Sequence, residues 1–206
     1  MCIRDRAIAQ RADALLVHHG LFWSGETSVI CSMKRRRIQP ILQHELNVFA
    51  YHLPLDCHIE LGNNACIAGL LSIKNLKQHM AGKTPGLLWS GELSEALTPS
   101  DFARFIAQKF NREPELVLAD AALIKHVAWC SGAAQDFIEL AFNLGAQAYL
   151  SGEISERTFY QAKELGIHYY AAGHHATERF GIQALGEHLG QQFGIAHEFL
   201  DSDNPV

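Results

Sequence analysis

The chain has 206 residues, of which 48% are hydrophobic and 19% are charged. This composition is typical of a globular protein with a packed core and excludes a disordered chain. Its 17 lysines and arginines stand against 22 aspartates and glutamates, which gives a net charge of −5. A protein that coats nucleic acid needs a basic excess, so a nucleic-acid partner is not expected. The sequence has no apolar run long enough to cross a membrane, and no membrane partner is expected either.

The cysteines indicate a reducing compartment. They stand at positions 2, 31, 57, 66 and 130, an odd number without any CxxC pair. This spacing favours free buried thiols over a disulfide framework. The first six residues are charged and lack the apolar segment of a secretory signal. We therefore expect a cytoplasmic protein.

Short apolar runs and helical periodicities alternate along the chain. The apolar runs predict strands, in chain order, over residues 14–17, 47–51, 116–118, 125–129, 148–150 and 167–172. The periodicities predict the tail of a helix at 7–11 and helices over 32–45, 63–76, 99–111, 135–144, 155–165 and 175–191. Residues 84–92 are expected to form a loop or short strand, because Pro85, Gly86 and Gly91 interrupt them. The alternation predicts an α/β fold with largely parallel sheets.

A cluster of turn residues near Lys83 marks a weak division of the chain. It predicts an N-terminal α/β half over residues 1–83 and a C-terminal half over residues 84–206.

Two adjacent histidines follow the first predicted strand. His18 and His19 come directly after the apolar run 14–17. In open α/β sheets, binding sites form outside the carboxyl ends of the strands. Two neighbouring imidazoles at such an end could bind two neighbouring metal ions, or they could be exposed loop histidines.

The second predicted strand ends in a similar polar group. His52 follows this strand, and Asp56 comes four residues later, beyond Pro54, which stiffens the loop. The carboxylate of Asp56 could give one oxygen to each of two cations. The other interpretation is that Asp56 caps a turn and that His52 is packed at the strand end.

A third polar group opens the last predicted helix. Gly173 allows the strand before it to turn sharply, and His174 and Glu178 follow four residues apart. This spacing places both side chains on one face of a helix, the arrangement in which other helical metal motifs bind one ion. The other interpretation is that Glu178 only favours the helix N-terminus and that the histidine is solvated.

Together the three groups predict a metal site without thiolate ligands. His18, His19, Asp56, His174 and Glu178 form a donor set that suits Zn, Mn, Fe or Ni. Five ligands are too many for one catalytic zinc ion with an open position. They suit two divalent metal ions per chain, roughly 3.5–4 Å apart, with water in the remaining positions.

Three blocks of the sequence resemble one known family. Residues 12–23 resemble the histidine-pair block of the Nif-three-like dinuclear metal-centre family, whose members are labelled GTP cyclohydrolase 1 type 2 homologues. Residues 51–56 together with 61–64 match the second block, and residues 171–178 match the third. The order and spacing fit the short bacterial members, and the resemblance extends from about residue 9 to the C-terminus.

The resemblance implies that the five residues of the predicted donor set hold two metals, with His52 beside them. It further implies two interlinked α/β halves with mostly parallel or mixed sheets, the metal site between them, and a toroidal homohexamer. An initial helix and strand would precede the histidine pair in this family, and Met1–Arg6 matches neither. We therefore expect a chain truncated at its start, whose sheet lacks one strand.

A metal-dependent hydrolase is the function that this site favours. Two metals would activate a bridging water near neutral pH and polarise a phosphoryl or carbonyl oxygen of a small substrate, such as a nucleotide or phosphoester. His52 or Glu153 could move protons, although Glu153 could equally support a ligand or the start of a helix. The alternative is a non-enzymatic metal store, sensor or scaffold.

Overall fold

The computed structural model describes residues 2–120 and 123–206. The strands are β1 (Ala14–Val17), β2 (Asn47–Ala50), β3 (Lys74–Ala81), β4 (Thr84–Leu97), β5 (Glu115–Val117), β6 (Ile124–Trp129), β7 (Ala148–Ser151) and β8 (His168–Ala171). The helices are α1 (Ile3–Ala9), α2 (Ser32–Gln43), α3 (Leu53–Cys57), α4 (Asn63–Leu70), α5 (Pro99–Phe110), α6 (Ile138–Asn143), α7 (Glu156–Leu165), α8 (His174–Glu178) and α9 (Phe180–Phe193), with a short 3₁₀ turn η1 (Gln135–Phe137) before α6.

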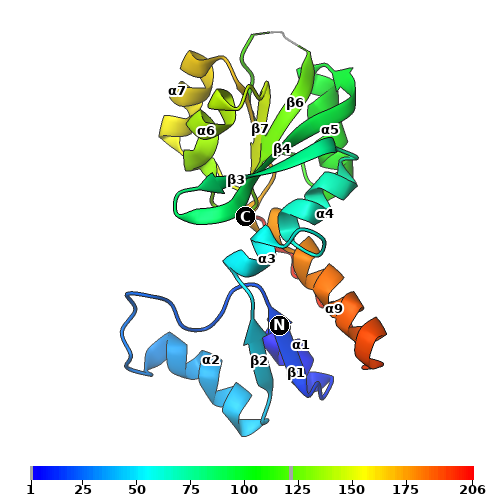
Figure 1. Ribbon diagram of the computed structural model, residues 1–206. Coiled ribbons are helices and arrows are strands. Elements are labelled where there is room, and N and C mark those ends of the chain that lie inside the picture. Colours follow the sequence, from blue (N-terminus) through cyan, green and yellow to red (C-terminus); the bar gives the residue numbers. More distant parts are fainter. Residues whose placement is uncertain (1, 121–122) are drawn as a thin grey trace.

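The strands form two separate sheets (Figure 1). The small sheet pairs β1 with β2 in parallel, and the large sheet has the order β3-β4-β6-β7-β8-β5. Its central strands β6, β7 and β8 are parallel, whereas β3, β4 and β5 join in antiparallel pairs. The predicted α/β fold is confirmed, and the large sheet is mixed.

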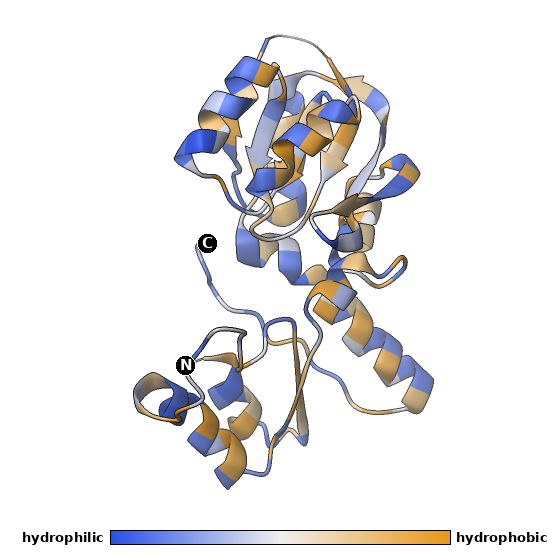
Figure 2. Cartoon of the chain, turned by 60° about the vertical axis from the view of Figure 1, so that its left-hand side comes forward, coloured by the Kyte–Doolittle hydropathy of each residue, from blue (hydrophilic) through white to orange (hydrophobic). Residues whose placement is uncertain are grey.

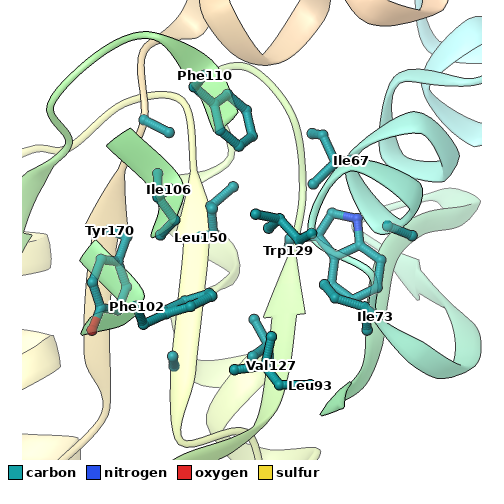
Figure 3. Packing of buried hydrophobic residues seen from close by; sticks show 14 of the residues in the cluster. Ile67, Ile73, Leu93, Phe102, Ile106, Phe110, Val127, Trp129, Leu150 and Tyr170 are labelled. Atoms are coloured by element: carbon teal, nitrogen blue, oxygen red, sulfur yellow. The ribbon is translucent and has the colours of Figure 1, made fainter. Parts of the chain in front are cut away.

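The large sheet is covered on both faces, with α4 and α5 on one side and α6 and α7 on the other (Figure 1). On the first side Phe102, Ile106 and Phe110 repeat at helical spacing along α5 and pack against Trp129 and Tyr170 of the sheet (Figure 3). Each helix over the sheet carries both hydrophobic and hydrophilic residues (Figure 2), as a helix with one buried side requires. This core makes the large sheet a rigid base for the strand ends.

The small sheet has much less cover. The burial pattern of β2 is mostly exposed, and the side chain of Phe49 is 51% exposed. Helix α9 reaches from the large-sheet half to β1 and connects the two halves. No helix among the described residues is long and apolar enough to span a membrane.

The prediction of a helix over 63–76 is wrong in its second part. Helix α4 ends at Leu70, Ser72 takes a positive φ of 52°, and residues 74–81 form the edge strand β3. Leu, Lys, Gln and Met in this stretch favour a helix by intrinsic propensity. The propensity yields to pairing with β4, a 14-residue strand that replaces the predicted loop or short strand at 84–92.

Two further boundaries need correction. Lys83 lies in the turn between the paired strands β3 and β4, so a division at residue 83 cuts through a hairpin, and the two sheets separate between residues 50 and 74. The last predicted helix, 175–191, begins at His174 and is interrupted at Arg179, which separates α8 from α9. The early start places His174 and Glu178 on the same short helix.

Candidate metal centre

All five predicted ligands come together between the two sheets. His18 and His19 follow β1, and Asp56 lies in α3, just beyond β2. His174 and Glu178 are the first and last residues of α8, which follows β8 of the large sheet. The small sheet therefore supplies one part of the cluster and the large sheet the other.

Glu178 is the centre of this cluster. Its Oε2 lies 3.0 Å from His19 Nε2 and 2.9 Å from His174 Nε2, and its Oε1 lies 3.6 Å from His18 Nε2. Three trios could each hold an ion, since their ligand atoms lie within 4.8 Å of one another: His18 with His19 and His52, His19 with His174 and Glu178, and His18 with Asp56 and Glu178. Two of the trios share Glu178, whose carboxylate could contribute to both.

Asp56 is held with one oxygen turned toward the cluster. Its Oδ1 accepts hydrogen bonds from Asn63 Nδ2 at 2.9 Å and from Ser131 Oγ at 2.7 Å. Its Oδ2 lies 3.3 Å from His18 Nε2. The side chain is only 3% exposed, so the two hydrogen bonds compensate for the burial of a charged group.

Several buried atoms of the cluster lack a hydrogen-bond partner. They are both ring nitrogens of His18, Nε2 of His174 and Oε2 of Glu178. His174 Nε2 and Glu178 Oε2 lie 2.9 Å apart, but their geometry does not form a hydrogen bond. A buried donor or acceptor left without a partner costs about 1–3 kcal/mol. Imidazole nitrogens and carboxylate oxygens with free lone pairs fit divalent metal ions, which would satisfy these atoms.

The carboxylates also set the charge of the imidazoles. Burial alone would lower the pKa of His18, but the proximity of Asp56 and Glu178 outweighs it and raises this pKa to about 9. Pairing with Glu178, opposed by burial and aided by Glu153, raises the pKa of His174 to about 9. Burial would raise the pKa of Glu178, but the surrounding histidines, first His174, hold it far below its ordinary value. Glu178 is thus ionised at neutral pH.

His52 differs from the other histidines of the cluster. Its ring centroid lies 5.1 Å from that of His18 and 5.2 Å from that of His19. Burial, together with the electrostatic interaction with these two neighbours, lowers the pKa of His52. Its imidazole is therefore neutral at pH 7 and can accept a proton. The ring centroids of Trp23 and His52 lie 5.2 Å apart in an edge-to-face arrangement, so the indole of Trp23 lies beside the cluster.

Glu153 lies behind His174. It follows β7, and its Oε1 lies 2.6 Å from His174 Nδ1. A carboxylate in this position fixes the proton on Nδ1 and turns Nε2 toward the cluster, as is usual for metal-binding histidines. Of the interpretations left open for Glu153, the geometry favours support of a ligand.

The loop after β6 completes the site, and sequence analysis missed its role. A Cβ at Gly132 would lie 2.0 Å from Glu178 Oε1, so a larger residue at this position would displace the carboxylate. The neighbouring Ser131 binds Asp56, and Thr177 Oγ1 accepts a hydrogen bond from the backbone N–H of Gly132. The small residues of this loop were the only signal in the sequence.

The fold and the donor cluster define an α/β protein with a candidate metal centre between its two sheets. The chain belongs to the Duf34/NIF3 (NGG1p interacting factor 3) family, whose model matches residues 2–205. The resemblance seen in the three sequence blocks is thereby confirmed.

Curated relatives agree over nearly the whole chain. The chain is 49% identical over 208 residues to a GTP cyclohydrolase 1 type 2 homolog of Vibrio cholerae, covering 100% of this chain and 82% of the relative. It is 46% identical over 202 residues to the protein of the same name from Allochromatium vinosum, covering 98% of this chain and 79% of the relative.

Solved structures share the fold. A structural-genomics protein named ybgI, of unknown function, superimposes with a TM-score of 0.92 at 42% identity, over 98% of this chain and 80% of that one. The protein TTHA1606 from Thermus thermophilus gives a TM-score of 0.86 at 30% identity, over 98% of this chain and 79% of that one.

Proposed function

We propose that the protein is a hydrolase that depends on two divalent metal ions held between its sheets. The observation that carries this proposal is the position of Glu178, which belongs to two potential ligand trios at once. His19 and His174 complete one trio, and His18 and Asp56 complete the other. One carboxylate shared by two donor groups is the arrangement that binds a pair of neighbouring ions.

The residues around the trios support the same chemistry. Bound divalent ions supply an activated water near neutral pH and polarise a substrate oxygen. Glu153 keeps His174 oriented, and Ser131 with Asn63 keeps one oxygen of Asp56 directed at the cluster. His52 is a neutral imidazole beside the ligands and would take up the proton released during hydrolysis.

The substrate that we propose is a small molecule with a phosphoryl or carbonyl group, such as a nucleotide or phosphoester. The name of the curated relatives, GTP cyclohydrolase 1 type 2 homolog, refers to a hydrolytic opening of a guanine nucleotide ring and supports a nucleotide. We further propose a toroidal homohexamer in the cytoplasm. The cysteines support a reducing compartment, since Cys2, Cys31, Cys57, Cys66 and Cys130 are all free.

A second candidate is a non-enzymatic metal-binding protein. The burial of three of the five candidate ligands supports it, because His18, Asp56 and Glu178 are exposed by only 7%, 2% and 9%. A buried site suits retention of a metal as well as catalysis.

The test begins with the metal content per chain, measured by elemental analysis of gel-filtered protein purified without chelator. About two ions per chain are expected in the wild type and fewer in Glu178→Gln, which removes the shared charge at nearly constant shape. Glu187→Gln on the exposed side of α9 is the matched control and should keep both ions.

Nucleotides and phosphoesters are then tested for hydrolysis with and without metal. Metal-dependent turnover that is lost in Glu178→Gln supports the hydrolase. Two bound ions without turnover of any substrate favour the second candidate. A folded wild-type protein that cannot be loaded with metal contradicts both.

A further inference from the structure

The C-terminal segment, residues 194–206, returns to the cluster after α9. It contains no helix or strand, and in Figure 1 the end of the chain lies between the two sheets. The backbone oxygens of Pro205 and Val206 accept hydrogen bonds from Arg112 and from the backbone N–H of His175, and Asp201 contacts both α1 and α8. Nothing in the proposed hydrolysis uses this residue, so its side chain needs another explanation.

The carboxylate of Asp201 binds two neighbours of the predicted ligands. Its Oδ1 lies 2.8 Å from His175 Nε2, and its Oδ2 accepts a hydrogen bond from Arg179 Nη1 at 2.9 Å. His175 and Arg179 each stand one residue after a ligand, His174 and Glu178. Because the two neighbours are also four residues apart, one carboxylate spans the turn of α8 beside the ligands.

The segment also contacts the half of the protein that carries the other ligands. Arg6 of α1 donates a hydrogen bond to the backbone oxygen of Asp201 at 2.5 Å, and Gln10 donates to Glu198 Oε1 at 2.9 Å. Helix α1 leads into β1, and the histidine pair follows this strand. Asp201 therefore connects the segment before the histidine pair with the helix that bears His174 and Glu178.

Arg179 is anchored from a second side. Its Nη2 donates to the backbone oxygen of Phe110 at the end of α5, at 2.9 Å. Helix α5 belongs to the core of the large sheet. Phe110 therefore holds one side of this guanidinium and Asp201 the other, and the backbone N–H of His175 donates to Val206 O at 2.9 Å as a further contact of the segment with α8.

We propose that Asp201 is a positioning residue for the metal centre, which holds α8 so that His174 and Glu178 face the histidine pair. The inference rests on the proposed function, because it requires that the cluster binds metal. Asp201 acts through His175 and Arg179 and does not contact the ions. Without the carboxylate of Asp201, α8 loses two of the side-chain contacts that fix its orientation.

The test measures Co²⁺ binding to the full chain, by competition with a chromophoric chelator and by the visible absorption of bound Co²⁺. Support of a ligand from outside the coordination sphere is worth about 10- to 100-fold in metal affinity. We expect Asp201→Asn to weaken Co²⁺ binding by about tenfold, the lower end of this range, and to change the spectrum. Asp203→Asn, an equal change at an exposed carboxylate two residues away, should alter neither. Asp201→Glu, which keeps the charge, should restore part of the affinity.

Wild-type affinity and spectrum in Asp201→Asn would overturn the proposal, even if its melting temperature falls, because a purely structural contact affects stability alone. If Asp201→Asn does not fold, His175→Gln removes one of the two contacts and should still change the spectrum. An unchanged Co²⁺ spectrum in His175→Gln would also overturn the proposal. A wild-type chain that binds no Co²⁺ refutes the metal centre itself. This result is distinct from wild-type affinity in Asp201→Asn, which refutes only the role of Asp201.

Discussion

Replacement of Gly132 by alanine should separate backbone strain from damage to the metal centre. Gly132 has a φ of +68°, and an added Cβ would lie 2.0 Å from Glu178 Oε1 and 2.9 Å from Glu178 Cδ. Contacts under 3.0 Å force a displacement, and the near atoms are those of the shared carboxylate. We expect Gly132→Ala to push this carboxylate away from the imidazoles.

Gly166→Ala is the matched control. Gly166 has a φ of +71°, and nothing lies within 4 Å of its added Cβ. A left-handed conformation costs a residue other than glycine about 1–2 kcal/mol. For a protein of this size each kcal/mol lowers the melting temperature by about 2–4 °C, so Gly166→Ala should melt about 2–8 °C below the wild type and Gly132→Ala at least as far below.

The metal affinity distinguishes the two variants. A displaced ligand should weaken metal binding at least about tenfold in Gly132→Ala, whereas Gly166→Ala should bind as the wild type does. Thermal unfolding of the metal-free proteins and chelator competition measure the two quantities. Equal stability losses with wild-type metal affinity in both variants would refute the reasoning.

Three further predictions concern the cluster and the core. Glu153→Gln should weaken metal binding by about 10- to 100-fold, because Nδ1 of His174 loses its carboxylate; unchanged chelator competition would argue against this support. Since the pKa of His18 and of His174 is raised to about 9, a metal must displace protons at pH 7. Apparent affinity should therefore rise from pH 7 to pH 9 and then level off, and proton release on titration should be seen in weakly buffered solution; a flat pH profile would contradict the raised values. Phe102→Ala should destabilise the protein by about 3–5 kcal/mol in urea unfolding, because its ring is fully buried against Tyr170; a loss below about 1 kcal/mol would show that the core collapses around the gap.

The clustering of the candidate ligands could be predicted because it depends on local relations. His18 and His19 follow an apolar strand directly, and the i, i+4 spacing of His174 and Glu178 becomes a 2.9 Å approach in the structure. The carboxyl ends of strands collect such residues whatever the remaining topology is. The resemblance to the family also matched the order in which the three groups occur along the chain.

The supporting residues could not be predicted, because their roles depend on tertiary contacts. Ser131 reaches Asp56 across 75 positions of the chain, and Gly132 meets Glu178 only after two loops have packed together. Edge strand β3 was missed for a related reason. It is exposed along most of its length, so its sequence lacks the apolar pattern that indicates a strand. It forms a strand because its backbone pairs with β4.

The distance along the chain between the two parts of the cluster has a consequence for biosynthesis. About 160 residues separate His18 from Glu178. At roughly 5–20 residues per second, the ribosome needs roughly 8–32 s to synthesise this interval. During that time the histidine pair exists without Glu178 and could bind a transition metal through its imidazoles. If the cluster binds metal as proposed, exchange after release from the ribosome would decide which ion it holds, together with the geometry of the folded site.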